Sequence, residues 1–285
     1  MAGRKRDIAN LRLNKAKPSE CKSLSNSNKV YSVCENVACP HQFTCLNQGL
    51  ALFHILGRYC SRTCAFCSET DRKLLPPDPT EPRNVALAVK RLNLKYAVIK
   101  SFSRNDLKDN GANHIALTVN EIHEVNPDTT VEVIIHDSAK SKDDLKTIIA
   151  SSPEVIAHNV RTVPRLHPRL FDNDEYDCSL DTLLNIKTLN ADIVTKSGLM
   201  LGLGENNYEV LSVVSDVHDT GCSSITIGQY LPHFKQQAQP SRYVAPWEFF
   251  EFKHLSMKMG YSSVRSGPFT CSSFDALNMY REIAE

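Results

Sequence analysis

The feature that most constrains this chain is a concentration of cysteines near its N-terminus. Residues 34 to 67 hold six of the ten cysteines among the 285 residues. They fall into two triads, one spaced C-x4-C-x5-C and the next spaced C-x3-C-x2-C: Cys34, Cys39 and Cys45, then Cys60, Cys64 and Cys67. Thiols this close together indicate that this part of the chain folds around a metal or a set of disulfides.

Thiolates in threes fit an iron–sulfur cubane better than the alternatives. A cubane normally takes four protein ligands, so a triad binds three irons and leaves the fourth open. Structural zinc prefers two C-x2-C pairs or mixed Cys/His sets, which neither triad supplies. Disulfides need an oxidising compartment, and residues 1 to 7 lead into no apolar signal segment. The triads therefore favour iron–sulfur clusters over zinc or disulfides.

Composition narrows the class of protein further. The hydrophobic content of 41% is enough for one large core. A net charge of +1 gives no general electrostatic reason to expect a nucleic acid partner. The longest apolar runs, such as 131 to 135, are too short to span a bilayer. We therefore expect a cytoplasmic protein that binds neither nucleic acid nor membrane.

The rest of the chain follows a strand, loop, helix pattern. Residues 1 to 30 are polar and aperiodic, which predicts a flexible N-terminal arm. After a proline-rich stretch at 75 to 82, helices are expected near 83 and at 112–125, 141–150, 179–189, 206–219 and 246–258. Strands are expected at 96–99, 131–135, 155–157, 193–195 with 199–201, and 224–227. Five or six such units predict an α/β fold with a parallel sheet, short of the eight units of a closed barrel.

Aromatic residues are dense in the last of these helices. Trp247, Phe249, Phe250 and Phe252 read as a helix face that packs on the barrel.

Polar side chains follow the predicted strands. They include Lys100 to Arg104, His136 to Ser138, His158 to Arg161, Thr195 to Gly198 and Gly228 to Tyr230. Because functional groups in parallel α/β folds gather at the carboxyl ends of the strands, we expect these segments to line a site. For Ser101, Ser103 and Ser138 taken singly, an ordinary role as a helix cap or turn residue is the better explanation, whereas a functional role is favoured for Asn159 and Lys196.

These features together resemble radical S-adenosylmethionine (SAM) enzymes, and within them the lipoyl synthase family. The resemblance rests on the C-x3-C-x2-C loop with Phe66 before its last cysteine, on the upstream triad, and on several further stretches between about 30 and 280. These are 94–99, 106–112, 158–166, 195–205, 226–231 and 266–268. It implies a partial (β/α)6 barrel of the radical SAM type with N- and C-terminal extensions.

The resemblance also implies two 4Fe-4S clusters and SAM as cofactors. Cys60, Cys64 and Cys67 match the ligands of the catalytic cluster that cleaves SAM. Cys34, Cys39 and Cys45 match those of an auxiliary cluster that serves as the sulfur source. Ser273 falls on the position of the auxiliary cluster's fourth ligand, which in the family is a serine oxygen.

SAM-binding residues follow from the same match: Ser101 and Asn159 for polar groups, Lys196 for the carboxylate, and Asp137 for a ribose hydroxyl. The chain also departs from the family pattern. Arg161 replaces an acid, and Cys271 and Phe274 replace an arginine and a tyrosine around the serine ligand. These departures are typical of a divergent member or a paralogue.

The implied activity is a radical SAM sulfurtransferase, with sulfur inserted at C6 and C8 of an octanoyl chain on a lysine of a lipoyl carrier domain. Implied partners are a ferredoxin or flavodoxin type electron donor and an iron–sulfur carrier protein. Alternatives are a radical SAM paralogue with another acyl or peptidyl substrate, a non-catalytic iron–sulfur protein, and a zinc-binding interaction module.

The expected division of the chain follows from these assignments. Residues 1–30 form the flexible arm, 31–49 the auxiliary cluster extension and 50–260 the radical SAM barrel. Residues 261–285 form a C-terminal segment that closes the auxiliary site.

Overall fold

The computed structural model describes residues 30–32, 39–57, 59–62, 64–65, 74–136, 141–171, 176–232 and 237–285. The strands of these residues are β1 (Tyr31–Ser32), β2 (Leu50–Ile55), β3 (Tyr96–Ser101), β4 (Thr130–Ile135), β5 (Val155–His158), β6 (Val194–Leu201), β7 (Ser224–Gln229) and β8 (Ser263–Gly267). The helices are α4 (Gln42–Asn47), α5 (Glu81–Arg91), α6 (Ala112–Val125), α7 (Lys142–Ala150), α8 (His167–Leu170), α9 (Tyr176–Leu189), α10 (Asn207–Asp219), α11 (Pro246–Met259) and α12 (Ala276–Ala284), with a 3-10 turn at Pro164–Leu166.

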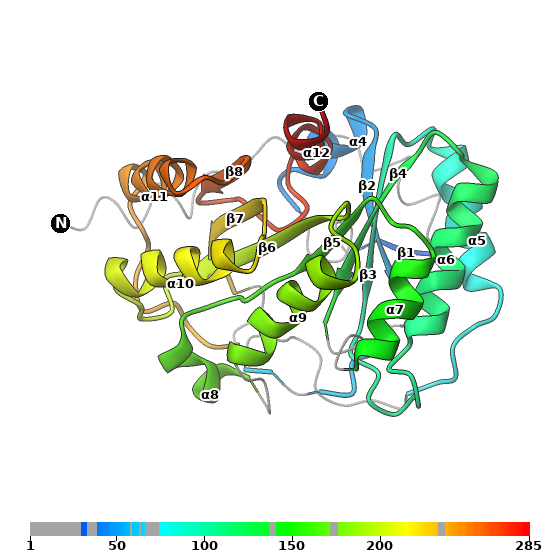
Figure 1. Cartoon of the computed structure of the whole chain (residues 1–285), viewed down its shortest axis with the longest axis horizontal. Coiled ribbons are helices and arrows are strands. Elements are labelled where there is room, and N and C mark those ends of the chain that lie inside the picture. The colour runs from blue at the N-terminus through cyan, green and yellow to red at the C-terminus, as the bar shows by residue number, and fades with distance from the viewer. Residues whose placement is uncertain are drawn as a thin grey trace.

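One sheet carries all eight described strands in sequence order, β1 to β8. Strands β2 to β8 pair in parallel, and only the short β1 runs antiparallel, along the edge of β2. Within the described part of the chain the two edges do not pair with each other, so the barrel stays open (Figure 1). Six strand–helix units run from β2 with α5 to β7 with α11, as expected for a partial (β/α)6 barrel.

Helices α5, α6, α7, α9 and α10 cover the outer side of the sheet (Figure 1). Their sequences carry clear boundary signals. Pro82 lies in the first turn of α5, where its missing N–H costs no helical hydrogen bond. Asn206 caps α10 in a reciprocal capping box with Glu209. These local signals explain why the helices begin where the sequence predicted, to within a few residues.

Helices α4 and α12 lie side by side at one end of the sheet (Figure 1). Cys45 of α4 and Leu277 of α12 belong to one apolar cluster with Leu50 and Tyr96, the first residues of β2 and β3. The segment after the N-terminal arm and the last segment of the chain therefore meet over the amino ends of the first barrel strands.

Three strands were not predicted. β1 has only two residues, β2 lies inside the cysteine-rich segment, and β8 is short and polar, with sequence SVRSG. The two fragments expected around residue 196 are one continuous strand, β6. This continuity moves Lys196 away from a strand end to the third position of the strand.

The prediction for the aromatic face of α11 was wrong for two of its four residues. Phe249 and Phe252 are buried at 1% and 2% exposure, whereas Trp247 and Phe250 are exposed at 64% and 72%. A helix presents only one stripe to the sheet, so four aromatics within six positions cannot all face inward.

The helices of the described residues include none with the length and apolar character that a membrane span requires.

Candidate functional site

A cavity of about 480 Å³ opens where the carboxyl ends of the strands, the cysteine segments and the C-terminal segment meet. Its volume lies within the range of small-molecule and cofactor sites. Four cysteines from three separate segments line it: Cys39, Cys60, Cys64 and Cys271. The cavity is thus shared by both cysteine triads, as far as the structure describes them.

Cys60 and Cys64 lie on the loop that follows β2. The loop is attached to the end of β3 at the residue after Cys60: Ser61 donates its backbone N–H to the carbonyl of Ser103 at 2.8 Å. Its hydroxyl donates to the same carbonyl at 2.9 Å and accepts the backbone N–H of Asn105 at 2.9 Å. Cys67, the third predicted ligand, lies outside the described residues.

A second group of thiols forms where α4 meets the C-terminal segment. Burial raises the pKa of the Cys45 thiol to about 12, and the charges of Cys271 and Cys39 add to that shift. Cys39 and Cys271 therefore lie within electrostatic range of Cys45, although no three His, Cys, Asp or Glu side chains of the described residues are close enough together to form a complete metal site. Cys34 lies outside the described residues.

Ser273, the predicted fourth ligand of the auxiliary cluster, lies beside Cys271. It is 8% exposed, and its Oγ lies 3.7 Å from the Sγ of Cys271. Close contact fixes the segment that carries both: a Cβ on Gly228 of β7 would lie 1.9 Å from the carbonyl oxygen of Thr270. The C-terminal segment therefore rests directly on the backbone of a barrel strand.

Ser101 and Asn159, both predicted to bind SAM, line the cavity. Among the described residues, the Ser101 Oγ and the Asn159 Oδ1 are buried and have no hydrogen-bond partner. The Asn159 Nδ2 donates to the Ser272 hydroxyl at 3.2 Å. Buried polar atoms without partners are costly, so a polar ligand that gave these two oxygens hydrogen-bond partners would be favoured at this position. Asp137 lies outside the described residues.

Lys196, the fourth predicted SAM-binding residue, does not line the cavity. Its Nζ lies 2.5 Å from the Glu132 Oε2, and both side chains are almost fully buried. The Tyr96 hydroxyl donates to the same carboxylate oxygen at 2.7 Å. The structure thus places Lys196 in a polar network inside the barrel.

The wall formed by β2, β3 and β4 carries His54, Lys100 and His136. Burial, with a smaller effect of the Lys100 charge, lowers the pKa of His54 to about 3. The same two causes, in the same order, hold the pKa of His136 well below its ordinary value. Both imidazoles are therefore neutral at neutral pH. The sequence interpretation listed His136 as a strand-end residue and assigned no role to His54, because an isolated histidine is more often a hydrogen-bonded structural residue than a metal ligand.

Arg161, at a position where the family resemblance implies an acid, also lines the cavity. Its backbone is left-handed, with φ of 75°, and bridges to Leu199. Its guanidinium lies 4.4 Å from the centre of the Phe171 ring, a cation–π contact.

These observations fit iron–sulfur clusters and SAM as ligands of the cavity. Thiols of both triads line it, and two of the lining side chains, Ser101 and Asn159, have a buried oxygen without a hydrogen-bond partner among the described residues.

Comparison with curated proteins gives relatives over most of the chain. The chain is 42% identical over 255 residues to a lipoyl synthase of Alkaliphilus metalliredigens, covering 90% of this chain and 88% of the relative. It is 40% identical over 264 residues to a lipoyl synthase of Histophilus somni, covering 92% and 82%. No protein-family model matches.

Solved structures with the same fold are much more distant in sequence. Methylornithine synthase superposes with a TM-score of 0.60 at 11% identity, covering 91% of this chain and 77% of that one. Streptococcus suis SuiB bound to S-adenosylmethionine superposes with a TM-score of 0.61 at 9% identity, covering 79% and 53%. At these identities the likeness shows the fold alone.

Proposed function

The chain belongs to the lipoyl synthase family, and we propose that its two cysteine segments hold two 4Fe-4S clusters with different tasks. It is an enzyme of the radical SAM sulfurtransferase class, with iron–sulfur and SAM cofactors and a protein substrate. When bound, the cofactors supply the 5′-deoxyadenosyl radical and the inserted sulfur. The residues of the chain bind, orient and shield these reactants.

In this proposal Cys60, Cys64 and Cys67 hold the cluster that binds SAM. Ser101 and Asn159 hydrogen-bond polar groups of SAM through the oxygens that lack partners in the cavity wall, and Asp137 accepts from a ribose hydroxyl. The single observation that carries the proposal is that cysteines of both triads line the same cavity as these two side chains.

Cys34, Cys39 and Cys45 hold the auxiliary cluster, with the Ser273 oxygen as fourth ligand. The electrostatic effect of Cys39 and Cys271 on the Cys45 thiol supports this assignment. It also supports the proposed division of the chain, in which residues 31–49 and 261–285 close the auxiliary site on the barrel formed by 50–260, after the arm of 1–30.

The proposed substrate is an octanoyl chain on a lysine of a lipoyl carrier domain, with sulfur inserted at C6 and C8. A ferredoxin or flavodoxin type protein supplies electrons, and an iron–sulfur carrier protein rebuilds the auxiliary cluster. We place this system in the cytoplasm.

An anaerobic single-turnover assay with dithionite, SAM and an octanoyl-lysyl peptide tests the proposal. The expected products are 5′-deoxyadenosine and a peptide that has gained two sulfurs. Cys60→Ala should abolish both products, whereas Cys45→Ala should keep 5′-deoxyadenosine and lose sulfur insertion. Loss of 5′-deoxyadenosine in Cys45→Ala and not in Cys60→Ala would reverse the two assignments.

One observation favours a second candidate, a radical SAM paralogue with another acyl or peptidyl substrate. The cavity is lined by Lys100 and Arg161, while an octanoyl chain is uncharged and apolar. Formation of 5′-deoxyadenosine by the wild type with an unchanged octanoyl peptide would favour this paralogue. Absence of both products would favour a non-catalytic cluster protein.

A further inference from the structure

Leu56, the residue that follows β2, has an uncommon backbone conformation. Its φ is 66°, in the left-handed region that side chains other than glycine rarely occupy. Its side chain is fully buried. Such a conformation is energetically unfavourable and persists only where the surroundings enforce it. The turn at Leu56 directs the chain from β2 into the loop that carries Cys60.

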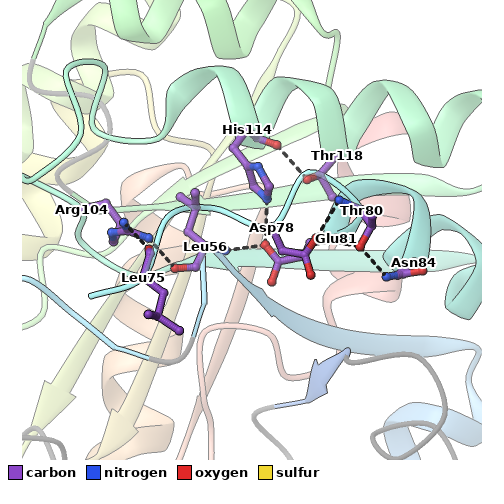
Figure 2. Close-up of polar contacts among 9 residues, drawn as sticks. All are labelled: Leu56, Leu75, Asp78, Thr80, Glu81, Asn84, Arg104, His114 and Thr118. Atoms are coloured by element: carbon purple, nitrogen blue, oxygen red, sulfur yellow. Dashed lines mark hydrogen bonds and ion pairs between the residues drawn. The ribbon is translucent and has the colours of Figure 1, made fainter. Parts of the chain in front are cut away.

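Two charged side chains from other elements hold the backbone of Leu56 (Figure 2). Its N–H donates to the Oε2 of Glu81, at the start of α5, at 2.7 Å. Its carbonyl accepts from the Nη1 of Arg104, just after β3, at 3.0 Å. Hydrogen bonds to charged groups are stronger than neutral ones, so this pair can enforce the left-handed turn.

Each of these side chains is itself fixed (Figure 2). The Nε2 of His114, on α6, lies 2.7 Å from the same oxygen of Glu81. Arg104 is 2% exposed, donates to the carbonyl of Leu75 at 2.9 Å, and contacts both carboxylate oxygens of Asp106 at 2.8 and 2.7 Å. The hydrogen bond from Arg104 lowers the pKa of Asp106.

The side chain of Leu56 packs closely against Gly111, the residue before α6. A Cβ on Gly111, whose φ is 90°, would lie 2.3 Å from the Leu56 Cδ1. Gly111 thus serves two purposes, since its conformation favours glycine and its missing side chain leaves room for Leu56. The backbone and the side chain of Leu56 are both specified.

The same segment that holds Leu56 also holds the residue after Cys60. Arg104 binds the Leu56 carbonyl through its side chain, while its neighbours Ser103 and Asn105 bind Ser61. Cys60 therefore lies between two anchor points that share one short stretch, 103 to 105. Burying Glu81 and Arg104 carries a desolvation cost that an ordinary strand end does not require.

We infer that Glu81 and Arg104 are positioning residues that fix the turn at Leu56 and thereby set where the loop presents Cys60 to the SAM-binding cluster. The inference rests on the proposed function for the identity of that cluster. The turn itself can be tested without it.

Hydrogen exchange in the full-length, anaerobically reconstituted protein tests the turn. In Glu81→Ala the Leu56 amide loses its acceptor, and its exchange should accelerate about 10- to 100-fold. Glu81→Gln keeps an oxygen acceptor and should stay close to wild type. The matched control is Glu154→Ala. Glu154 also accepts a backbone N–H, from Val131 at 2.7 Å, and its carboxylate lies 3.5 Å from the Nε2 of His123. This contact lies at the amino ends of the strands, opposite the end that carries the cavity.

The second readout is the electron paramagnetic resonance signal of the reduced SAM-binding cluster and its change on adding SAM. Glu81→Ala and Arg104→Gln should weaken or abolish that change and raise the KM for SAM, while the auxiliary cluster keeps its iron. Glu154→Ala should leave the signal at the wild-type level even if it lowers the melting temperature equally.

Two results would overturn the inference. One is unaltered exchange of the Leu56 amide in Glu81→Ala, and the other is a wild-type SAM response in both Glu81→Ala and Arg104→Gln. If Glu81→Ala fails to fold, Arg104→Gln and Arg104→Lys carry the same two readouts, and a wild-type SAM response despite faster exchange of the Leu56 amide counts against the positioning role. Failure of the proposed function looks different, because the wild type itself would then lack the SAM-responsive signal while the exchange result stands.

Discussion

The rings of His41 and Phe274 pack against each other, with centroids 4.2 Å apart. The His41 Nε2 also lies 3.0 Å from the carbonyl oxygen of Phe269. His41 comes two residues after Cys39, and Phe274 directly follows Ser273. This contact therefore joins the two segments proposed to hold the auxiliary cluster.

Weakening that contact should release the auxiliary cluster first. In Phe274→Ala we expect the loss of an aromatic pair worth about 0.5–1.5 kcal/mol beyond its buried area. Iron analysis should then show the auxiliary cluster depleted while 5′-deoxyadenosine formation persists. Phe250→Ala is the control, since Phe250 is 72% exposed. Equal loss of both clusters would contradict the prediction.

Ser273 and Cys271 offer competing ligands, with the oxygen and the sulfur 3.7 Å apart. We expect Ser273→Ala to lose sulfur insertion into the octanoyl peptide while SAM cleavage continues. Cys271→Ala should retain insertion, because the serine oxygen is the proposed ligand. The peptide mass and the amount of 5′-deoxyadenosine, measured together for each variant, decide whether the Ser273 oxygen or the Cys271 sulfur is the ligand. If Cys271→Ala is the inactive variant, the ligand is the thiolate.

The neutral histidines of the cavity wall make stability depend on pH. Burial and the Lys100 charge lower the pKa of His54 from its ordinary value of 6.5 to about 3. Between these values the unfolded chain binds a proton that the folded chain does not bind. Stability is therefore complete above about pH 6.5 and falls on acidification, by up to about 1.4 kcal/mol per pH unit for each such histidine.

Urea unfolding at pH 7, 6 and 5 measures this slope. His54→Gln should flatten it, and the remaining slope should include the contribution of His136, whose pKa is also lowered. Lys100→Met should raise the pKa of His54, because it removes a nearby positive charge. His254→Gln, on the exposed side of α11, serves as control. An unchanged slope in His54→Gln would show that His54 is protonated in the folded state.

The sequence predicted those parts of the fold that have strong local signals. The run Tyr96 to Ile99 is apolar because a parallel strand is buried on both faces. This continuous apolar run is enough to predict the strand from the sequence. β8 lacks such a run, and its place depends on pairing with β7, which is a long-range property. Proline, glycine and capping residues gave most helix boundaries correctly.

The candidate site was predictable where it depended on strand ends or on the family resemblance. Ser101 and Asn159 both line the cavity. Lys196 does not line it, and this prediction failed because a polar residue inside a continuous strand looks the same in sequence as one at a strand end. Its partner Glu132 lies two strands away. The hydrogen bond from the Leu56 N–H to Glu81 could not be predicted either, because it depends on how the start of a helix and the end of a strand are placed in space.

The pairing of Lys196 with Glu132 leads to a prediction that separates a structural role from SAM binding. Removing one partner, as in Glu132→Met, leaves a buried charge unpaired and should cost about 3–5 kcal/mol of unfolding free energy. The double variant Glu132→Met with Lys196→Met should recover most of that loss, apart from about 1 kcal/mol for the Tyr96 hydroxyl, which loses its acceptor. Asp143→Asn breaks the exposed pair with Lys146 and should change stability little.

SAM cleavage by the double variant then decides the role of Lys196. Since Lys196 is almost fully buried against Glu132 and does not line the cavity, we expect the stable double variant to form 5′-deoxyadenosine with a wild-type KM for SAM. A KM raised tenfold or more in a variant of wild-type stability would mean that Lys196 leaves Glu132 to bind the SAM carboxylate, as the family resemblance implied. In that case Lys196 would pair with Glu132 in the absence of SAM and with the SAM carboxylate when SAM is bound.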